Sequence, residues 1–122
     1  MAVYLPNAIV GNGRVLVTLG RSAEIMGLFY PGIDFPQNVH ELMLACHFPA
    51  RDHFCWTFQE CWDRRQRYCH DLAPVVETTL RHHGPDFTLT LVDSVLPDAD
   101  VFVRTCQAQA SQTAATLMHY FE

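Results

Sequence analysis

Hydrophobic and polar residues alternate with a period of two along most of the chain, which is the pattern of half-buried β-strands. In the segment RVLVTLG, the residues Val15, Val17 and Leu19 fall on one face, and Leu16 and Thr18 fall on the other. Similar segments, rich in β-branched and aromatic residues, predict further strands at 23–30, 53–59, 74–82, 86–93, 100–109 and 113–121. The pattern therefore predicts an all-β fold.

Short segments with turn chemistry separate these strands. They are GNG at 11–13, GRSA at 20–23, HHGPD at 82–86 and the break at Pro97 and Asp98. Only residues 36–47 show helical spacing, through Val39, Leu42 and Met43, so we predict at most one short helix, of one or two turns. Strands at regular intervals with hairpin signals predict one antiparallel β-sandwich domain over residues 1–122.

Composition narrows the classes of function. The chain has 122 residues, of which 49% are hydrophobic and 17% charged, which suits a single folded domain with one moderate core. The net charge is −5, and no run of basic residues forms a stripe. We therefore expect no binding to nucleic acid and none to an anionic membrane.

The amino terminus lacks a basic segment followed by an apolar core, so it does not resemble a secretory signal. No apolar run approaches the length of a membrane span. The five cysteines form an odd set without a C-x-x-C pair, which favours reduced thiols over a disulfide framework. We expect a cytoplasmic protein.

Cysteines and histidines concentrate in one segment, where Cys46, His47, His53 and Cys55 are candidate metal ligands. Thiolate and imidazole are good zinc ligands, but this spacing fits no common zinc pattern. We expect buried thiols, surface histidines and no cofactor, with a small metal-binding protein as an alternative. His82 and His83 lie beside a Gly-Pro turn and, as neighbours on a strand, point to opposite sides, so we expect exposed turn residues that do not share one ion.

Two pairs of carboxylates could serve a glycosidase, Glu60 with Asp63 and Asp98 with Asp100. A general acid needs an apolar pocket that raises its pKa, and the local sequence provides none. The arginines at 64, 65 and 67 are expected to form ion pairs with these acids. We therefore predict no catalytic residue in this chain.

The segment FYPGIDFPQNVHE, residues 29–41, combines flat aromatic side chains with planar polar groups, which are the residue types that bind sugars. The candidate site residues are Tyr30, Asp34, Phe35, Gln37, Asn38 and His40. A proline-stiffened loop with its aromatics packed on the sandwich has the same composition. Composition by itself leaves both alternatives open.

The motifs IVGNG and FYPGIDFPQNVHE, with the later segment QRYCHDLAPVVETTLRHHGPDFTLTLVDSVLPDADVFVRT, resemble the amino-terminal region of prokaryotic glucoamylase-type enzymes of glycoside hydrolase family 15. The resemblance covers nearly the whole chain. In that family the region forms a large antiparallel supersandwich, and hydrolysis takes place in a following helical (α/α)6 barrel with two catalytic glutamates. The resemblance implies that residues 1–122 form an incomplete, non-catalytic part of such a sandwich.

By the same resemblance, the six candidate residues of the 29–41 segment would shape the substrate mouth of the barrel or the interface with it. The implied function is α-glucan hydrolysis in carbohydrate metabolism, with only weak binding of oligosaccharide by this chain. Alternatives are a free-standing carbohydrate-binding module and the metal-binding protein named above. An incomplete sandwich has open edges, so we also expect a homo-oligomer.

Overall fold

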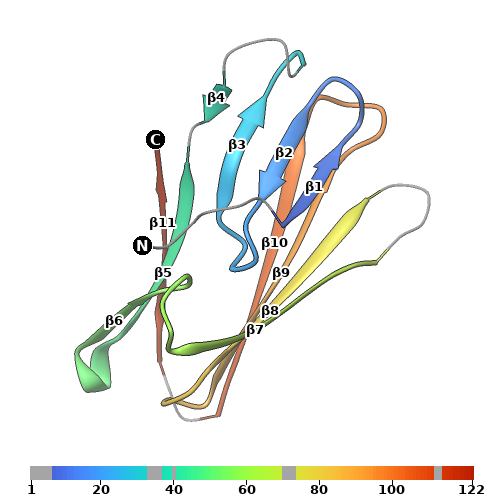
Figure 1. The fold of residues 1–122 in the computed structure, drawn as a ribbon. Helices are drawn as coiled ribbons and strands as arrows, with labels where there is room; N and C mark the ends of the chain where they lie inside the picture. Colours follow the sequence, from blue (N-terminus) through green and yellow to red (C-terminus); the bar gives the residue numbers. More distant parts are fainter. Residues whose placement is uncertain (1–6, 33–36, 40, 70–73, 112–113) are drawn as a thin grey trace.

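The computed structural model describes residues 7–32, 37–39, 41–69, 74–111 and 114–122. Within these residues, two antiparallel sheets form the two layers of a sandwich, which confirms the predicted fold class (Figure 1). A single 3₁₀ turn, Pro49–Arg51, is the only helical element of the described part.

The first sheet has the strand order β1-β2-β3-β5-β11, with β4 paired to β3 and β6 paired to β5. Its strands are β1 (Ala8–Gly11), β2 (Leu16–Leu19), β3 (Ile25–Phe29), β4 (Gln37–Val39), β5 (Leu42–Phe48), β6 (His53–Trp56) and β11 (Thr116–Phe121). The second sheet has the order β10-β9-β8-β7. Its strands are β7 (Trp62–Tyr68), β8 (Val75–His82), β9 (Phe87–Val95) and β10 (Phe102–Ala110).

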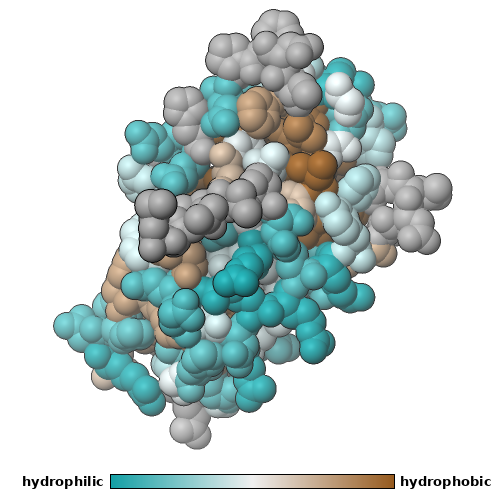
Figure 2. All heavy atoms as spheres, viewed as in Figure 1, coloured by the Kyte–Doolittle hydropathy of each residue, from teal (hydrophilic) through white to brown (hydrophobic). Residues whose placement is uncertain are grey.

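The core lies between the two sheets. Along β9 every second residue from Phe87 to Val95 is buried, and in the facing sheet Val15, Val17 and Leu19 are buried, as the alternation predicts. Figure 2 shows hydrophilic residues over the lower middle of one face, where β7 lies in Figure 1, and hydrophobic residues around β2 and β3. The alternation with a period of two therefore correctly predicts which residues of these strands face the core.

The helix predicted within residues 36–47 is wrong, because the described residues of this segment form β4 and most of β5. Leu44, Ala45, Cys46 and Phe48 of β5 are buried, so the strand reads as an almost continuous apolar run. β5 pairs with β11 along one edge and with β3 and β6 along the other. A central strand of this kind lacks the clean alternation that identifies a half-buried one.

Strand β7 was not predicted, because polar residues occupy its inner face. Arg64 and Gln66 alternate with the exposed residues of the strand. The Gln66 amide donates to the Gly20 carbonyl and to the Thr78 hydroxyl, both at 2.9 Å. Hydrogen bonds of this kind allow polar side chains to face the core, and they remove the hydrophobic signal of the strand.

The GNG motif forms the turn between β1 and β2 and also joins it to the other sheet. Gly13 has a φ of +92°, which only glycine adopts readily. The Asn12 side chain donates to the carbonyls of Leu96 and Ala99 at 2.9 and 3.0 Å, and its oxygen accepts from the backbone N–H of Val15 at 2.9 Å. The motif therefore fixes the first hairpin against the β9–β10 turn.

Candidate functional site

Two of the residues predicted for a sugar site, Tyr30 and Asn38, line one cavity of about 450 Å³. The cavity is completed by Val15, Leu28, Asp100 and Phe102. Tyr30 follows β3, Asn38 lies on β4, and Asp100 and Phe102 come from the β9–β10 turn and the start of β10. Two aliphatic side chains, two aromatic rings and the polar groups of Tyr30, Asn38 and Asp100 therefore meet where the two sheets end.

The polar side of this cavity is organised around Asp100. The Arg14 guanidinium lies 2.6 Å from the Asp100 carboxylate, and it lowers the pKa of that carboxyl together with a hydrogen bond from Tyr30. A general acid requires the opposite shift. The carboxylate is therefore suited to accept hydrogen bonds and unsuited to protonate a leaving group.

Of the other predicted residues of the 29–41 segment, only Gln37 is described by the structure, and it does not line this cavity. Gln37 is exposed on β4, with its amide over Gly27 of β3, where the absence of a side chain leaves it room. Asp34, Phe35 and His40 lie outside the described residues.

A second group of side chains, which we name the Cys/His cluster, consists of His53, Cys55, Cys61 and His82. Each offers one ligand atom, and these four atoms lie within 4.8 Å of one another. Cys55 and Cys61 are joined as a disulfide, so the expectation that all five cysteines are free is wrong. Its residues come from β6, from the segment before β7 and from the end of β8, and β6 lies at the end of the sandwich away from the end of β3 (Figure 1).

Register explains how the chain assembles the Cys/His cluster. In the β5–β6 hairpin, Phe48 pairs with His53 and Cys46 with Cys55, so His53 and Cys55 share the face that points into the sandwich. In the second sheet His82 pairs with Trp62, the residue after Cys61. The Trp62 indole donates to the Trp56 carbonyl at 3.1 Å, which holds the two hairpins together beside the cluster.

His82 is the most enclosed imidazole of the cluster, with 7% of its surface exposed. Its ring packs against the rings of Trp62 and Phe48, with centroids 4.8 and 5.0 Å away, and lies 5.5 Å from the ring of His53. Burial, with smaller contributions from His53 and other nearby groups, lowers the pKa of His82 and favours the neutral ring. The expectation that His82 is an exposed turn residue is therefore wrong, because the last residue of β8 faces the core.

The structure separates the four metal candidates of the sequence. His53 and Cys55 belong to the cluster, whereas Cys46 is a buried free thiol whose pKa burial raises to about 11. His47 points outward and lies 3.4 Å from Asp52. Sequence spacing did not single out Cys61 and His82 as the other members, because they meet His53 and Cys55 where the two sheets pack on each other.

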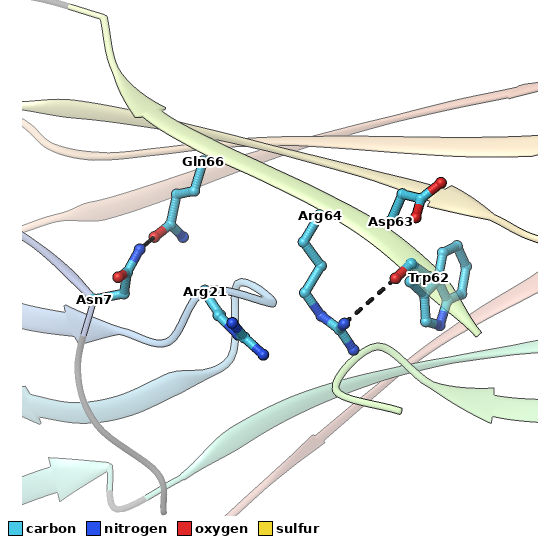
Figure 3. Close-up of a pocket in the computed structure, with 6 residues that line it drawn as sticks. All are labelled: Asn7, Arg21, Trp62, Asp63, Arg64 and Gln66. Atoms are coloured by element: carbon cyan, nitrogen blue, oxygen red, sulfur yellow. Dashed lines mark hydrogen bonds between the residues drawn. The ribbon is translucent and has the colours of Figure 1, made fainter. Parts of the chain in front are cut away.

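Another cavity, polar and about 360 Å³ in volume, lies beside β7 (Figure 3). It is lined by Asn7, Arg21, Trp62, Asp63, Arg64 and Gln66. In Figure 3 the side chains of Asn7 and Gln66 point toward each other, joined by a hydrogen bond of 2.6 Å. The Asp63 carboxylate lies 2.8 Å from the His83 imidazole, and both side chains are exposed.

Arg64 does not form the ion pair expected from the sequence. Its guanidinium donates to the carbonyls of Thr57, Gln59 and Trp62 and to the Ser22 hydroxyl. Burial lowers its pKa, with a smaller contribution from Arg21. Through these hydrogen bonds the guanidinium holds the segment before β7 in place. Because its donors are already used, Arg64 is poorly suited to bind an anion in this cavity.

Among the described residues, no helix is both long and apolar enough to cross a membrane. No protein-family model matches this chain, no curated protein is similar to it, and no solved structure matches it.

Proposed function

We propose that this chain is a non-catalytic β-sandwich domain of a glucoamylase-like glycoside hydrolase. In this proposal the Tyr30 cavity contributes a wall of the substrate mouth, and a helical barrel domain supplies the catalytic glutamates. The resemblance of the IVGNG and FYPGIDFPQNVHE motifs motivates the family. The antiparallel sandwich agrees with it at the level of the fold, which by itself does not establish an activity.

The observation that carries the proposal is the meeting of Tyr30 and Asn38 with Phe102 and Asp100 in one cavity. Aromatic rings stack on the apolar face of a pyranose, and amide and carboxylate groups bind its hydroxyls. A cavity of 450 Å³ lies within the range of small-molecule sites, roughly 300 to 1,000 Å³. Because the cavity is open and has few polar groups, we expect it to contribute part of a sugar site.

The isolated chain is expected to bind maltooligosaccharides weakly, with a Kd in the millimolar range, about −4 kcal/mol. Titration followed by NMR measures this, with cellooligosaccharides as the comparison for the α-linkage. Tyr30→Ala should abolish the binding because it removes the aromatic wall. Phe54→Ala is the matched control, since Phe54 is an equally exposed aromatic outside the cavity.

The outcomes of this titration separate the alternatives. Micromolar affinity would favour a free-standing carbohydrate-binding module over a domain that needs a barrel. Equal binding by the Tyr30→Ala variant would show that the cavity does not take part in sugar binding. Hydrolysis of starch by the pure chain would contradict its non-catalytic role.

We also propose that the chain forms a homo-oligomer through β10. This strand pairs only with β9 among the described strands, and its residues from Thr105 to Ala110 are exposed on both faces. An uncovered edge strand is a template for pairing with another copy. Light scattering at micromolar concentration should therefore give at least twice the 13.9 kDa of one chain.

Ala108→Lys should convert this assembly to a monomer. Ala108 pairs with the buried Leu89, so its side chain lies on the inner but exposed face of β10, where a charge opposes contact. Gln107→Lys, on the other face, is the control. A monomeric wild-type chain would contradict the proposal.

A further inference from the structure

We propose that the Cys/His cluster binds one zinc ion when its two thiols are reduced, and that the disulfide is the oxidised, metal-free form of the same site. The inference is independent of the saccharide proposal, because the cluster and the Tyr30 cavity share no residue.

The geometry of the cluster fits tetrahedral zinc. With Zn–S near 2.3 Å and Zn–N near 2.0 to 2.1 Å, neighbouring ligand atoms of a tetrahedral site are about 3.3 to 3.8 Å apart. The four ligand atoms of the cluster already lie within 4.8 Å of one another. Small rotations of the side chains, and the separation of the two sulfurs on reduction, are sufficient to reach this geometry.

A second observation is the unpaired nitrogen of His82. Its Nδ1 accepts from the backbone N–H of Gly84 at 2.9 Å, so Nε2 carries the proton of the neutral ring. Nε2 is buried and has no hydrogen-bond partner among the described residues. A buried polar group without a partner is destabilising, and coordination of a metal is one way to satisfy it.

Zinc coordination through Nε2 requires the other tautomer of His82, with the proton on Nδ1. The backbone N–H of Gly84 must then release the ring, and Gly84 lies in the exposed turn between β8 and β9, where water can take its place. After the exchange, Nδ1–H is available as a donor.

The electrostatics of the cluster also suit a divalent ion. Two thiolates neutralise the charge of zinc, so the loaded site is neutral overall and is compatible with Arg51, which lines the adjoining cavity of about 410 Å³. That cavity is also lined by Cys61 and His82, which gives the ion a route to the site from the surface. Asp63 lies 2.8 Å from His83, and neither belongs to the cluster, although His83 lines the adjoining cavity.

Four protein ligands leave no open position for water or substrate, which is the arrangement of a structural zinc site. The ligands come from β6 in the first sheet, from the segment before β7 and from β8 in the second sheet. The ion would therefore connect the two layers at this end of the sandwich.

The two states are exclusive and exchange by a balanced reaction. Reduction of the disulfide by a dithiol yields two thiols and the oxidised dithiol, and zinc binding then releases the two thiol protons. In the reverse direction a low-molecular-weight disulfide takes two electrons from the zinc-bound thiolates, which form the Cys55–Cys61 bond, and zinc and two thiolates of the oxidant are released.

The test is a metal titration of the full chain, reduced with a dithiol and then freed of the reductant. We expect one zinc ion per chain, an increase in Tm with zinc, and a tetrahedral cobalt(II) spectrum with thiolate charge-transfer bands. Oxidised glutathione should release the zinc while one disulfide forms. Absence of zinc binding, or a cobalt spectrum without thiolate bands, would overturn the inference.

Matched variants distinguish the cluster from adventitious binding. His82→Gln and Cys61→Ser should each weaken zinc binding by more than about tenfold. His47→Gln and Cys69→Ser are the controls, because His47 points outward beside Asp52 and Cys69 is an exposed free thiol. If His82→Gln does not fold, His53→Gln replaces it. Equal losses in the controls would show that the cluster is not the site.

Discussion

An Arg104→Met variant is expected to lose about 3 to 5 kcal/mol of unfolding free energy, measured by urea denaturation at neutral pH. Arg104 on β10 pairs with Asp93 on β9, and the side chains of the two residues are 8% and 0% exposed. The substitution leaves a buried carboxylate without its cation, which is far more destabilising than the loss of a surface ion pair.

The geometry of this pair explains the size of the effect. Nε and one terminal nitrogen of Arg104 donate to the two carboxylate oxygens of Asp93 at 2.6 and 3.0 Å. The same terminal nitrogen donates to the Ala23 carbonyl at 2.6 Å, in the turn between β2 and β3. Arg104 therefore neutralises Asp93 and also ties the second sheet to the first.

The loss should depend on pH in a defined direction. Burial raises the pKa of Asp93, and Arg104 opposes the rise. Without Arg104 the pKa in the folded chain rises further, so between the ordinary value of about 3.9 and the raised value the folded state binds more protons than the unfolded state. Lowering the pH through this window therefore reduces the difference in unfolding free energy between Arg104→Met and wild type.

Arg14→Met is the control for burial. Arg14 lies at the same 2.6 Å from Asp100, but these side chains are 49% and 36% exposed. We expect a much smaller loss, because solvent screens this exposed pair. An Asp93→Leu, Arg104→Met double variant should recover much of the stability, because no charge is left unpaired. Equal losses in Arg14→Met and Arg104→Met would contradict the interpretation.

Phe48→Ala is expected to lose about 3 to 5 kcal/mol of unfolding free energy. Phe48 is 1% exposed, and its ring contacts those of Phe87 and His82 at centroid distances of 5.3 and 5.0 Å. Truncation leaves a cavity where the β5–β6 hairpin packs on the second sheet, and the neighbouring rings cannot fill it without leaving their own contacts.

Phe54→Ala in the same hairpin tests the register. Phe48 pairs with His53, and His47 pairs with Phe54, so Phe54 lies on the outer face and is 44% exposed. Its truncation should lose less than about 1 kcal/mol. Both variants are compared with wild type in the reduced, metal-free state, so that the cluster contributes equally. A larger loss for Phe54→Ala would place the wrong face of the hairpin in the core.

The zinc inference bears on where the protein works. The sequence favours the cytoplasm, where thiols are kept reduced, whereas the structure contains a disulfide. Under the proposal both are compatible, since the reduced cluster holds zinc in a reducing compartment and the disulfide forms when the zinc has been released by oxidation. Cytoplasmic location itself remains a prediction.

Local chemistry was sufficient for much of the fold. In the segments that became β2, β8 and β9, one face meets the core and the other does not, so the period of two appears directly in the sequence. Gly13 marked the first turn because its positive φ suits glycine, and Pro97 with Asp98 marked the break between β9 and β10. These properties depend on neighbours along the chain.

Tertiary structure decided the features that depend on residues distant in the sequence, namely the strand conformation of β5 and the inward side chains of β7. β5 became a strand because β11, β3 and β6 pair with its edges, which overrides its helical spacing. β7 places Arg64 inward because carbonyls of the preceding segment accept its hydrogen bonds. The family resemblance, and the function that it implies, stay predictions.

The two candidate sites follow the same division. The sequence by itself determined the residue types, namely an aromatic loop and a segment rich in cysteine and histidine. Only the packing of the two sheets brought Tyr30 to Asp100 and His53 to His82, across 70 and 29 positions of the chain. Contacts of this range are set by the packing of two sheets on one core, and no local pattern encodes them.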